Sequence, residues 1–548
     1  MKKITLLLII VFSQLSLANS KITETEKLAA TCKVWGFLKY YHPKVANGDF
    51  NWDQQLLDIL PKIEKAETKE EFSLIMENWI DNLGQVPLIA PIAIPKDIEY
   101  FDKNFDLSWI TGNKLFSKKL SKKLKFIENN RFQTDERMGP GYNPFKNGNY
   151  FDLTYDTTNS RILWLCMFWN LVEYNFPYKY VMDQKWDVTL EKTLPLVLNA
   201  KSEDDFFTAI RKMTAKLDDS HVEFVLFKSG IFSKGRSFFP ADGKIIDNKL
   251  VVTEILGDSL AQADDIKIGD VITKINDKTI EEFIVANKDL IAASNASQYN
   301  YKLVRTLLSA DSDIVNVEFL KEGKYITKTM KWFDYHDSHR NEFKKGAQKK
   351  KEKFKVLENN IGYVDMGILK EKNVPNMIEK LKSTKAIVFD MRNYPNGTYY
   401  EIANFLNAHE QIFAIYTYPD FNYPGRFYWT KGSTCGSENK DNYKGKVVVL
   451  LNEDSISQSE WTAMCFQTAG NTTIIGSQTA GADGNVTELD FRVFHTRYSG
   501  VGVYYPDKRE TQRIGIVPDI EVKPTIKGIQ EGKDEVLDRA LSFINTGK

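Results

Sequence analysis

Three serines stand at alternate positions in the segment NEDSISQSEW (452–461), directly after the apolar run KVVVLL (446–451). The apolar run is typical of a buried strand, and the residues after the serines are typical of a helix. A hydroxyl at such a corner can cap the helix by accepting a backbone N–H. It can also act as a nucleophile, because a helix N-terminus stabilises negative charge. One cap is enough for one helix, so the position alone leaves both interpretations open for Ser457.

A nucleophilic serine needs a base, and the unperturbed pKa of histidine lies near working pH. Most of the six histidines lie in predicted helix, strand or linker contexts with no polar motif around them. His221 differs, because it follows KLDDS (216–220) where a predicted helix ends. The alternative is that His221 interacts only with the helix end.

The bulk composition bounds the class of protein. A chain of 548 residues is long enough for three or four domains of about 150 residues each. Lys+Arg and Asp+Glu both number 73, which argues against a nucleic-acid partner. Four cysteines without a CxxC pair are too few for a disulfide scaffold, and six histidines without HExxH give a metal site little support. We therefore expect no metal and no organic cofactor.

The N-terminal segment 1–20 has two lysines, an apolar stretch and a small-residue ending, ANS. This pattern is typical of a secretory signal peptide, and no later apolar run is long enough to span a bilayer. The sequence therefore predicts an exported protein, periplasmic or extracellular in a bacterium, without an integral membrane segment after signal removal.

An internal duplication fills the region 21–222. At an offset of 134 residues, KLAATCKVWGFLKYYHP (27–43) aligns with RILWLCMFWNLVEYNFP (161–177). Apolar residues three and four apart predict helices in both copies, which we place at 25–85 and 158–218. The paired cysteines and tryptophans are expected to pack in the core.

Short alternating segments follow at 223–335, and "IKIGDVITKIND" (266–277) resembles part of a PDZ domain. PDZ domains bind extended peptides at a sheet edge, although the ligand of this copy is open and an ordinary small β domain is the alternative. A charged linker is expected at 336–357, and strands alternate with helices at 358–548. NEDSISQSEW and MRNYPNG (391–397) both follow predicted strands, where α/β folds place their sites.

This order of segments resembles the C-terminal processing and tricorn-type serine peptidases of family S41. The resemblance implies a multidomain α+β chain whose C-terminal domain has the ClpP/crotonase-like α/β fold. Its S-x-S-x-S-E motif matches SISQSE and assigns the nucleophile to Ser457. Its D-x-R-x-x-x-G-G loop matches DMRNYPNG, with Asn396 in place of the first glycine. The resemblance then implies an oxyanion hole formed by the N–H groups of Gly397 and Gln458.

One departure concerns the base. The processing branch uses a lysine about 25 residues after the serine, and Ala482 stands at the aligned position. The tricorn branch uses a histidine, so the resemblance implies His221 as base, Ser220 as its orienting partner and Glu510 as the outer member. A two-residue shift of the alignment would place Gln512 there instead.

The sequence thus predicts an exported serine peptidase whose partner is a protein or peptide substrate, with its oligomeric state left open. The alternative is a non-catalytic exported protein that binds lipid or peptide on the same fold. The aromatic stretch 416–429 is interpreted either as a substrate wall or as ordinary loop packing.

Overall fold

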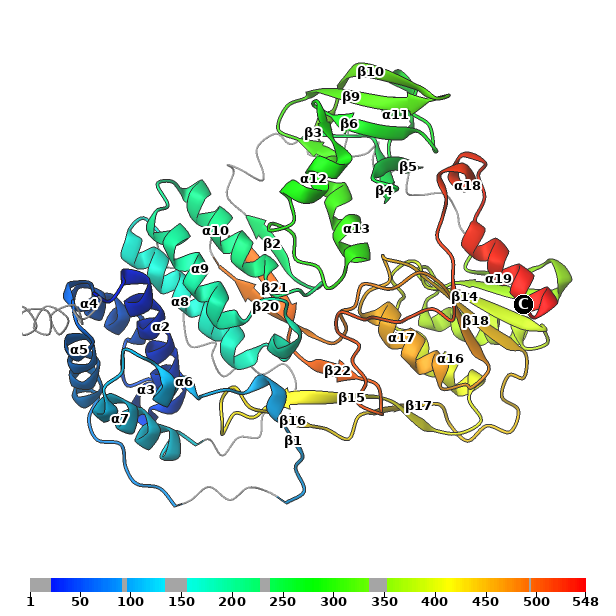
Figure 1. Ribbon diagram of the computed structural model, residues 1–548. Coiled ribbons are helices and arrows are strands. Elements are labelled where there is room, and N and C mark those ends of the chain that lie inside the picture. The colour runs from blue at the N-terminus through cyan, green and yellow to red at the C-terminus, as the bar shows by residue number, and fades with distance from the viewer. Residues whose placement is uncertain (1–20, 91–95, 134–154, 227–236, 335–351, 492–493) are drawn as a thin grey trace, which may run out of the picture.

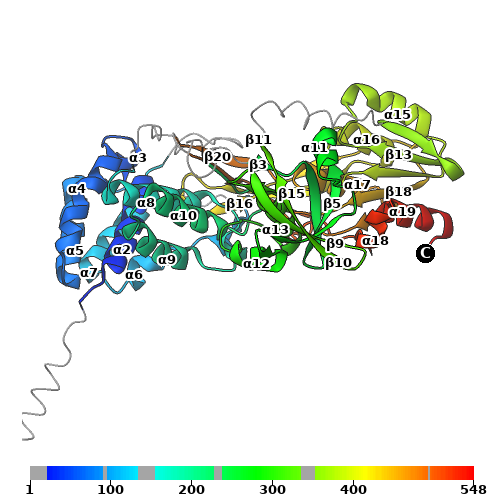
Figure 2. The same cartoon turned by 90° about the horizontal axis from the view of Figure 1, so that it is seen from above.

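The computed structural model describes residues 21–90, 96–133, 155–226, 237–334, 352–491 and 494–548. The predicted signal segment and most of the predicted charged linker therefore lie outside the described residues. Figure 1 shows three bodies: a helical region, a small β-rich domain above the centre, and an α/β domain at the other end. Seen from above in Figure 2, the helical region and the α/β domain form the two ends of an elongated chain. This arrangement confirms the predicted multidomain α+β class.

The helical region contains two sets of three helices. The first set is α2 (Glu24–Tyr41), α4 (Trp52–Lys65) and α5 (Lys69–Asn82), and the second is α8 (Thr158–Asn175), α9 (Trp186–Leu198) and α10 (Glu203–Ala215). Side-chain capping boxes start α2, α5, α8 and α10, as Thr23 and Glu26 do for α2. The short helix α3 (Pro43–Ala46) lies within the first set, and β1 (Tyr100–Phe101), α6 (Trp109–Gly112) and α7 (Lys118–Asn129) lie between the sets.

Each set contains one pair of tryptophans whose indole N–H groups donate to each other's backbone carbonyls. The indole N–H of Trp35 donates to the carbonyl of Trp52 at 3.1 Å, and Trp52 donates back at 3.0 Å. Trp169 and Trp186 repeat this pair at the same two distances. Because a buried indole N–H needs an acceptor, each pair satisfies two donors while it packs two large rings.

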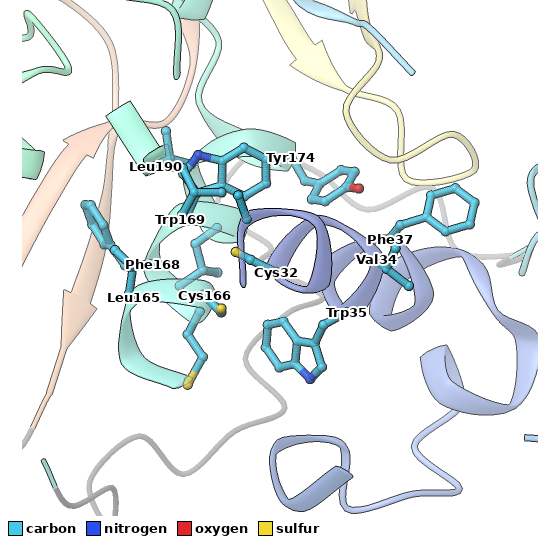
Figure 3. Packing of buried hydrophobic residues seen from close by; sticks show 14 of the residues in the cluster. Cys32, Val34, Trp35, Phe37, Leu165, Cys166, Phe168, Trp169, Tyr174 and Leu190 are labelled. Carbon is cyan, nitrogen blue, oxygen red and sulfur yellow. The ribbon is translucent and has the colours of Figure 1, made fainter. Parts of the chain in front are cut away.

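Equivalent positions of the two sets meet between α2 and α8. The rings of Tyr40 and Tyr174 are 4.5 Å apart, and the buried thiols of Cys32 and Cys166 are in contact (Figure 3). Gly36 faces its own equivalent, Asn170, whose side chain lies where a Cβ on Gly36 would stand. Contacts between equivalent residues mean that a local two-fold axis relates the two copies.

The small β-rich domain has one main sheet in the order β10-β9-β6-β5-β4, with β4 at its edge. Its elements are β3 (Ser237–Phe238), β4 (Ala241–Ile246), β5 (Lys249–Ile255), α11 (Asp258–Ala263), β6 (Val271–Ile275), β7 (Lys278–Thr279), α12 (Ile280–Ala286), α13 (Ala296–Leu307), β8 (Ser309–Ala310), β9 (Ile314–Lys321), β10 (Lys324–Lys331) and β11 (Phe333–Asp334). A groove of about 600 Å³ lies between β4 and α13. Lys244 lines it and forms an ion pair with Glu453 of the α/β domain.

The α/β domain contains a mixed sheet in the order β12-β13-β14-β18-β19-β23, parallel from β13 onward. Its strands are β12 (Phe354–Leu357), β13 (Ile361–Asp365), β14 (Ala386–Asp390), β18 (Lys446–Leu451), β19 (Thr472–Gly476) and β23 (Ile520–Glu521). Its helices are α15 (Val374–Leu381), α16 (Tyr399–Leu406), α17 (Gln458–Gln467), α18 (Ile526–Gln530) and α19 (Glu535–Thr546). The predicted site loops thus follow the adjacent strands β14 and β18.

Two small sheets pair strands that lie far apart in the sequence. One contains β1, β15 (Gln411–Pro419), β16 (Phe427–Trp429), β17 (Ser433–Cys435) and β22 (Gly502–Tyr504). The other has the order β2-β21-β20, formed by β2 (Glu223–Leu226), β21 (Phe494–Ser499) and β20 (Val486–Asp490). Because β2 begins two residues after His221, this second sheet brings that histidine to the C-terminal domain.

The aromatic stretch 416–429 packs on the helical region. The guanidinium of Arg131 lies 3.8 Å from the centre of the Tyr423 ring, and its Nε donates to the carbonyl of Asn422 at 2.6 Å. The hydroxyl of Tyr41 donates to the carbonyl of Pro424 at 2.6 Å. These contacts favour loop packing over a mobile substrate wall.

Among the described residues, no helix has both the length and the apolar character needed to cross a bilayer.

Candidate active site

Ser457 lies at the N-cap of α17 with φ of 54° and ψ of −108°. A positive φ is costly for a residue with a Cβ, so the surrounding contacts must hold it. Its backbone N–H donates to the carbonyl of Ala482 at 3.0 Å and to the carboxylate of Glu460 at 3.1 Å. In α/β-hydrolases, a strained strand-to-helix corner exposes a nucleophilic serine.

The neighbouring serines connect this corner to the loop after β14. Ser455 Oγ donates to the carbonyl of Met391 at 2.8 Å, and Ser459 Oγ donates to the carbonyl of Asn393 at 3.1 Å. Ser457 itself is the N-cap residue of α17, so neither Asp454 nor Ser455 occupies the cap position. Two of the three serines therefore position loops.

The side chain of Glu460 stabilises the corner that contains Ser457, a role that was not predicted from the sequence. Its buried carboxylate accepts from Gly481 N at 2.8 Å, from Ala482 N at 3.1 Å and from Thr479 Oγ1 at 2.5 Å, in addition to Ser457 N. Burial raises the pKa of Glu460 to about 7 although these donors favour the ionised form. The motif SISQSE contains this residue, but only the fold shows that its side chain points inward.

The segment 479–483 joins the corner to the helical region. Ser220 Oγ donates to the carbonyl of Ala480 at 2.7 Å, two residues before the carbonyl that accepts from Ser457 N. Ser220 Oγ also accepts from Ser294 N at 2.9 Å. The structure therefore places Ser220 as an anchor of this segment rather than against the ring of His221. Ser220, the residue before His221, and Ser457 thus hydrogen-bond to the two ends of the same three residues, 480–482.

His221 is buried and its ring contacts Ser499 and Asp219. Nδ1 lies 2.9 Å from Ser499 Oγ, which in turn lies 3.0 Å from Asp219 Oδ1. Because a carboxylate can only accept, Ser499 donates to Asp219 and accepts from His221 Nδ1–H. This arrangement leaves Nε2 without a proton and without a hydrogen-bond partner among the described residues. Burial lowers the pKa of His221, and Asp219 opposes that shift.

The Asp219 side chain is completely buried and accepts several hydrogen bonds. It accepts from the backbone N–H of His221 at 3.0 Å, from Ser499 N at 2.7 Å and from Gln512 Nε2 at 3.3 Å. Asp219 and Ser499 were not assigned from the sequence, although Asp219 is part of the DDSH motif. No local signal marked Ser499, which lies 278 residues from His221.

Glu510 does not contact His221 among the described residues. Its carboxylate accepts from the hydroxyl of Tyr180 at 2.6 Å and lies 4.0 Å from the ammonium of Lys103. Gln512, the alternative alignment, is the residue that reaches the Asp219 carboxylate. In this geometry Asp219, rather than Glu510, is the carboxylate on the Nδ1 side of His221.

The two predicted oxyanion donors lie at the start of α17 and in the loop between β14 and α16. Gln458 begins α17, directly after Ser457. Gly397 has φ of 68° and borders open space. Asn396 has a negative φ, so of these two positions only 397 needs the left-handed region that favours glycine. Asn396 instead donates to the carbonyl of Gly367 at 2.7 Å, so its substitution for glycine keeps the loop in place.

The charged residues of the same loop are structural. Arg392 makes paired hydrogen bonds to Asp390, at 2.9 and 2.7 Å, and to Asp534 at the start of α19, at 2.6 and 2.7 Å. Paired guanidinium–carboxylate contacts are strong and directional, so they fix the end of β14 against the C-terminal helix.

Comparisons with known proteins agree with this architecture. Residues 360–522 match the model of Peptidase family S41, and residues 228–297 match the model of the PDZ domain. The chain thus contains an S41 peptidase domain and a PDZ domain, and it is a serine-type peptidase. A comparison with curated proteins found no match.

Two solved structures of the protein CPAF have a similar fold. Mature CPAF complexed with lactacystin is 12% identical with a TM-score of 0.56, and the match covers 71% of this chain and 99% of CPAF. A CPAF mutant is also 12% identical with a TM-score of 0.58, covering 71% and 98%. At this identity the likeness shows a shared fold.

Proposed function

We propose that the protein is an exported serine peptidase in which Ser457 is the nucleophile and His221 the general base. Ser457 Oγ attacks the carbonyl carbon of the scissile peptide bond while His221 Nε2 takes its proton. The N–H groups of Gly397 and Gln458 stabilise the oxyanion. His221 then gives the proton to the leaving amine, and water hydrolyses the acyl-enzyme by the reverse proton route.

The observation that carries this proposal is the chain of contacts from His221 Nδ1 through Ser499 Oγ to the Asp219 carboxylate. Ser499 and Asp219 fix the proton on Nδ1, so Nε2 is free to act as a base. A histidine that served only a helix end would not need a buried carboxylate and a bridging hydroxyl behind it. Export is proposed from the segment 1–20 and is checked by locating the protein in fractionated cells.

A fluorophosphonate probe tests the nucleophile directly. The purified wild-type protein is expected to be labelled, because the probe phosphonylates an activated serine. Ser457→Ala and His221→Ala should both abolish labelling while the thermal unfolding temperature is retained. Labelling of Ser457→Ala at the wild-type rate would place the nucleophile elsewhere. A folded wild type that is never labelled would favour the non-catalytic binding protein.

The burial of His221 predicts peptidase activity at mildly acidic pH. A depressed pKa means that the neutral base persists below the usual histidine value of 6.5, and activity is lost only as the pH falls through the depressed pKa. The acid limb of kcat/KM is therefore expected to have its midpoint below 6.5. A pH profile measured with one peptide substrate checks this, and a midpoint at or above that value contradicts it.

A further inference from the structure

The loop that leads to Ser457 is held from two sides by the small β-rich domain. Glu453 and Asp454 lie four and three residues before Ser457. The ammonium of Lys244, on β4, forms an ion pair with Glu453. The hydroxyl of Tyr301, on α13, hydrogen-bonds to the Asp454 carboxylate. Since β4 and α13 are the two walls of the groove of about 600 Å³, each wall holds one acidic residue of this loop.

These two contacts lie between domains, on the side of the small domain that faces the α/β domain in Figure 1. The side chains of Lys244 and Glu453 are 28% and 19% exposed, so their ion pair is partly shielded from water. Burial raises the pKa of Asp454, and the hydrogen bond from Tyr301 opposes that shift. A partly buried carboxylate that loses its partner is destabilised, so removal of either contact favours a displaced loop.

The turn that begins at Asn452 connects these contacts to the nucleophile. The carbonyl of Asn452 accepts from Ser455 N at 3.0 Å, and its amide oxygen accepts from Asp454 N at 3.0 Å. Asn452 N in turn donates to Ser455 Oγ at 3.1 Å. One residue separates this closed turn from Ser457, whose positive φ depends on the contacts around it. A shift of the turn therefore displaces the Ser457 hydroxyl.

We propose that Lys244 and Tyr301 are positioning residues of the peptidase, which clamp the turn before Ser457 and thereby hold its hydroxyl in place for attack. The proposal rests on the proposed function, because it concerns the same nucleophile. Contacts that served only to join two domains would change stability and leave the reactivity of Ser457 unchanged. In this proposal the small domain contributes to kcat.

The test measures the rate at which a fluorophosphonate labels Ser457, because this probe contains no peptide that would occupy the groove. Lys244→Met and Tyr301→Phe are each expected to slow labelling about tenfold, and the double variant about a hundredfold, at an unchanged thermal unfolding temperature. The reason is that a displacement of a reacting group by about 1 Å costs about a hundredfold in rate. With one peptide substrate, the same variants should lower kcat and leave KM little changed.

A charge swap separates positioning from loss of packing. Lys244→Glu should slow labelling, and the double variant Lys244→Glu/Glu453→Lys should restore the rate to within about threefold of the wild type. Lys274→Met is the matched control, since Lys274 on β6 pairs with Glu318 on β9 at 3.1 Å within the small domain. It should be labelled at the wild-type rate.

Three results would overturn the proposal. The first is labelling of Lys244→Met and Tyr301→Phe at the wild-type rate, which would leave Ser457 as the nucleophile. The second is a raised KM at an unchanged labelling rate, which would assign the groove to substrate binding. The third is slow labelling that the charge swap does not restore. A folded wild type that is never labelled contradicts the proposed function instead, so the two failures are distinguishable.

Discussion

The His221→Ala variant is expected to hydrolyse peptides about ten-thousandfold more slowly than the wild type, with KM little changed. Without the imidazole, no group takes the proton from Ser457, and a neutral serine hydroxyl is a poor nucleophile. The measurement is kcat and KM for one fluorogenic peptide, together with a thermal unfolding curve.

Two comparisons sharpen this expectation. The double variant Ser457→Ala/His221→Ala should be no slower than either single variant, because residues that act as a unit are not additive. His409→Ala is the matched control, since His409 is exposed and pairs with Glu438 at 2.9 Å. A His221→Ala enzyme that keeps a tenth of the wild-type rate would require a different base.

Asp219→Asn is expected to lower kcat/KM by about a thousandfold or more, as for the carboxylate of other serine triads. The asparagine amide would present N–H groups where Ser499 and the backbone now donate to a carboxylate. Ser499 would then no longer hold the proton on Nδ1 of His221. The measurement is kcat/KM with circular dichroism as a check of folding.

Glu510→Gln provides the contrasting variant for the same experiment. Its carboxylate accepts from Tyr180, and glutamine can also accept there, so we expect kcat/KM within about threefold of the wild type. If Glu510→Gln proves as damaging as Asp219→Asn should be, then Glu510 is the outer member that the sequence resemblance implied.

The local parts of the candidate site could be predicted from the sequence. The strand β18 and the serines after it form a continuous motif, and the parallel pairing of β14 with β18 places the MRNYPNG loop beside that motif. Strand positions followed from the apolar pattern, as for β18, whose observed bounds Lys446–Leu451 agree with the predicted buried strand. The roles of Ser457, His221, Gly397 and Gln458 stay predictions until the variants are measured.

The parts that could not be predicted come from long-range pairing. Asp219 lies in a motif that drew attention to His221, but its role depends on Ser499, which only the pairing of β2 with β21 brings close. Ser220 was assigned to the wrong neighbour for the same reason, because its acceptor, Ala480, lies 260 residues away. A pattern in one segment cannot show which distant segment will face it.

The position of the absent lysine lies in a segment that has a structural role of its own. The segment 479–483, where the lysine of the processing branch would align, accepts or donates hydrogen bonds to Glu460, Ser220 and Ser457. Ala482 contributes its backbone there, and a side chain is not needed for these contacts. The fold thus uses this segment as a support for residues from two domains.

The pairing of Gly36 with Asn170 shows what fusion of two copies makes possible. In a homodimer of one helical unit, the same residue would face itself across the two-fold axis. Two asparagines would collide there, since the Asn170 side chain already occupies the space of a Cβ on Gly36, and two glycines would leave a void. Once both copies belong to one chain, each side of the axis can change independently. The small residue on α2 and the large one on α8 are therefore a knob and a hole that a symmetric assembly could not contain.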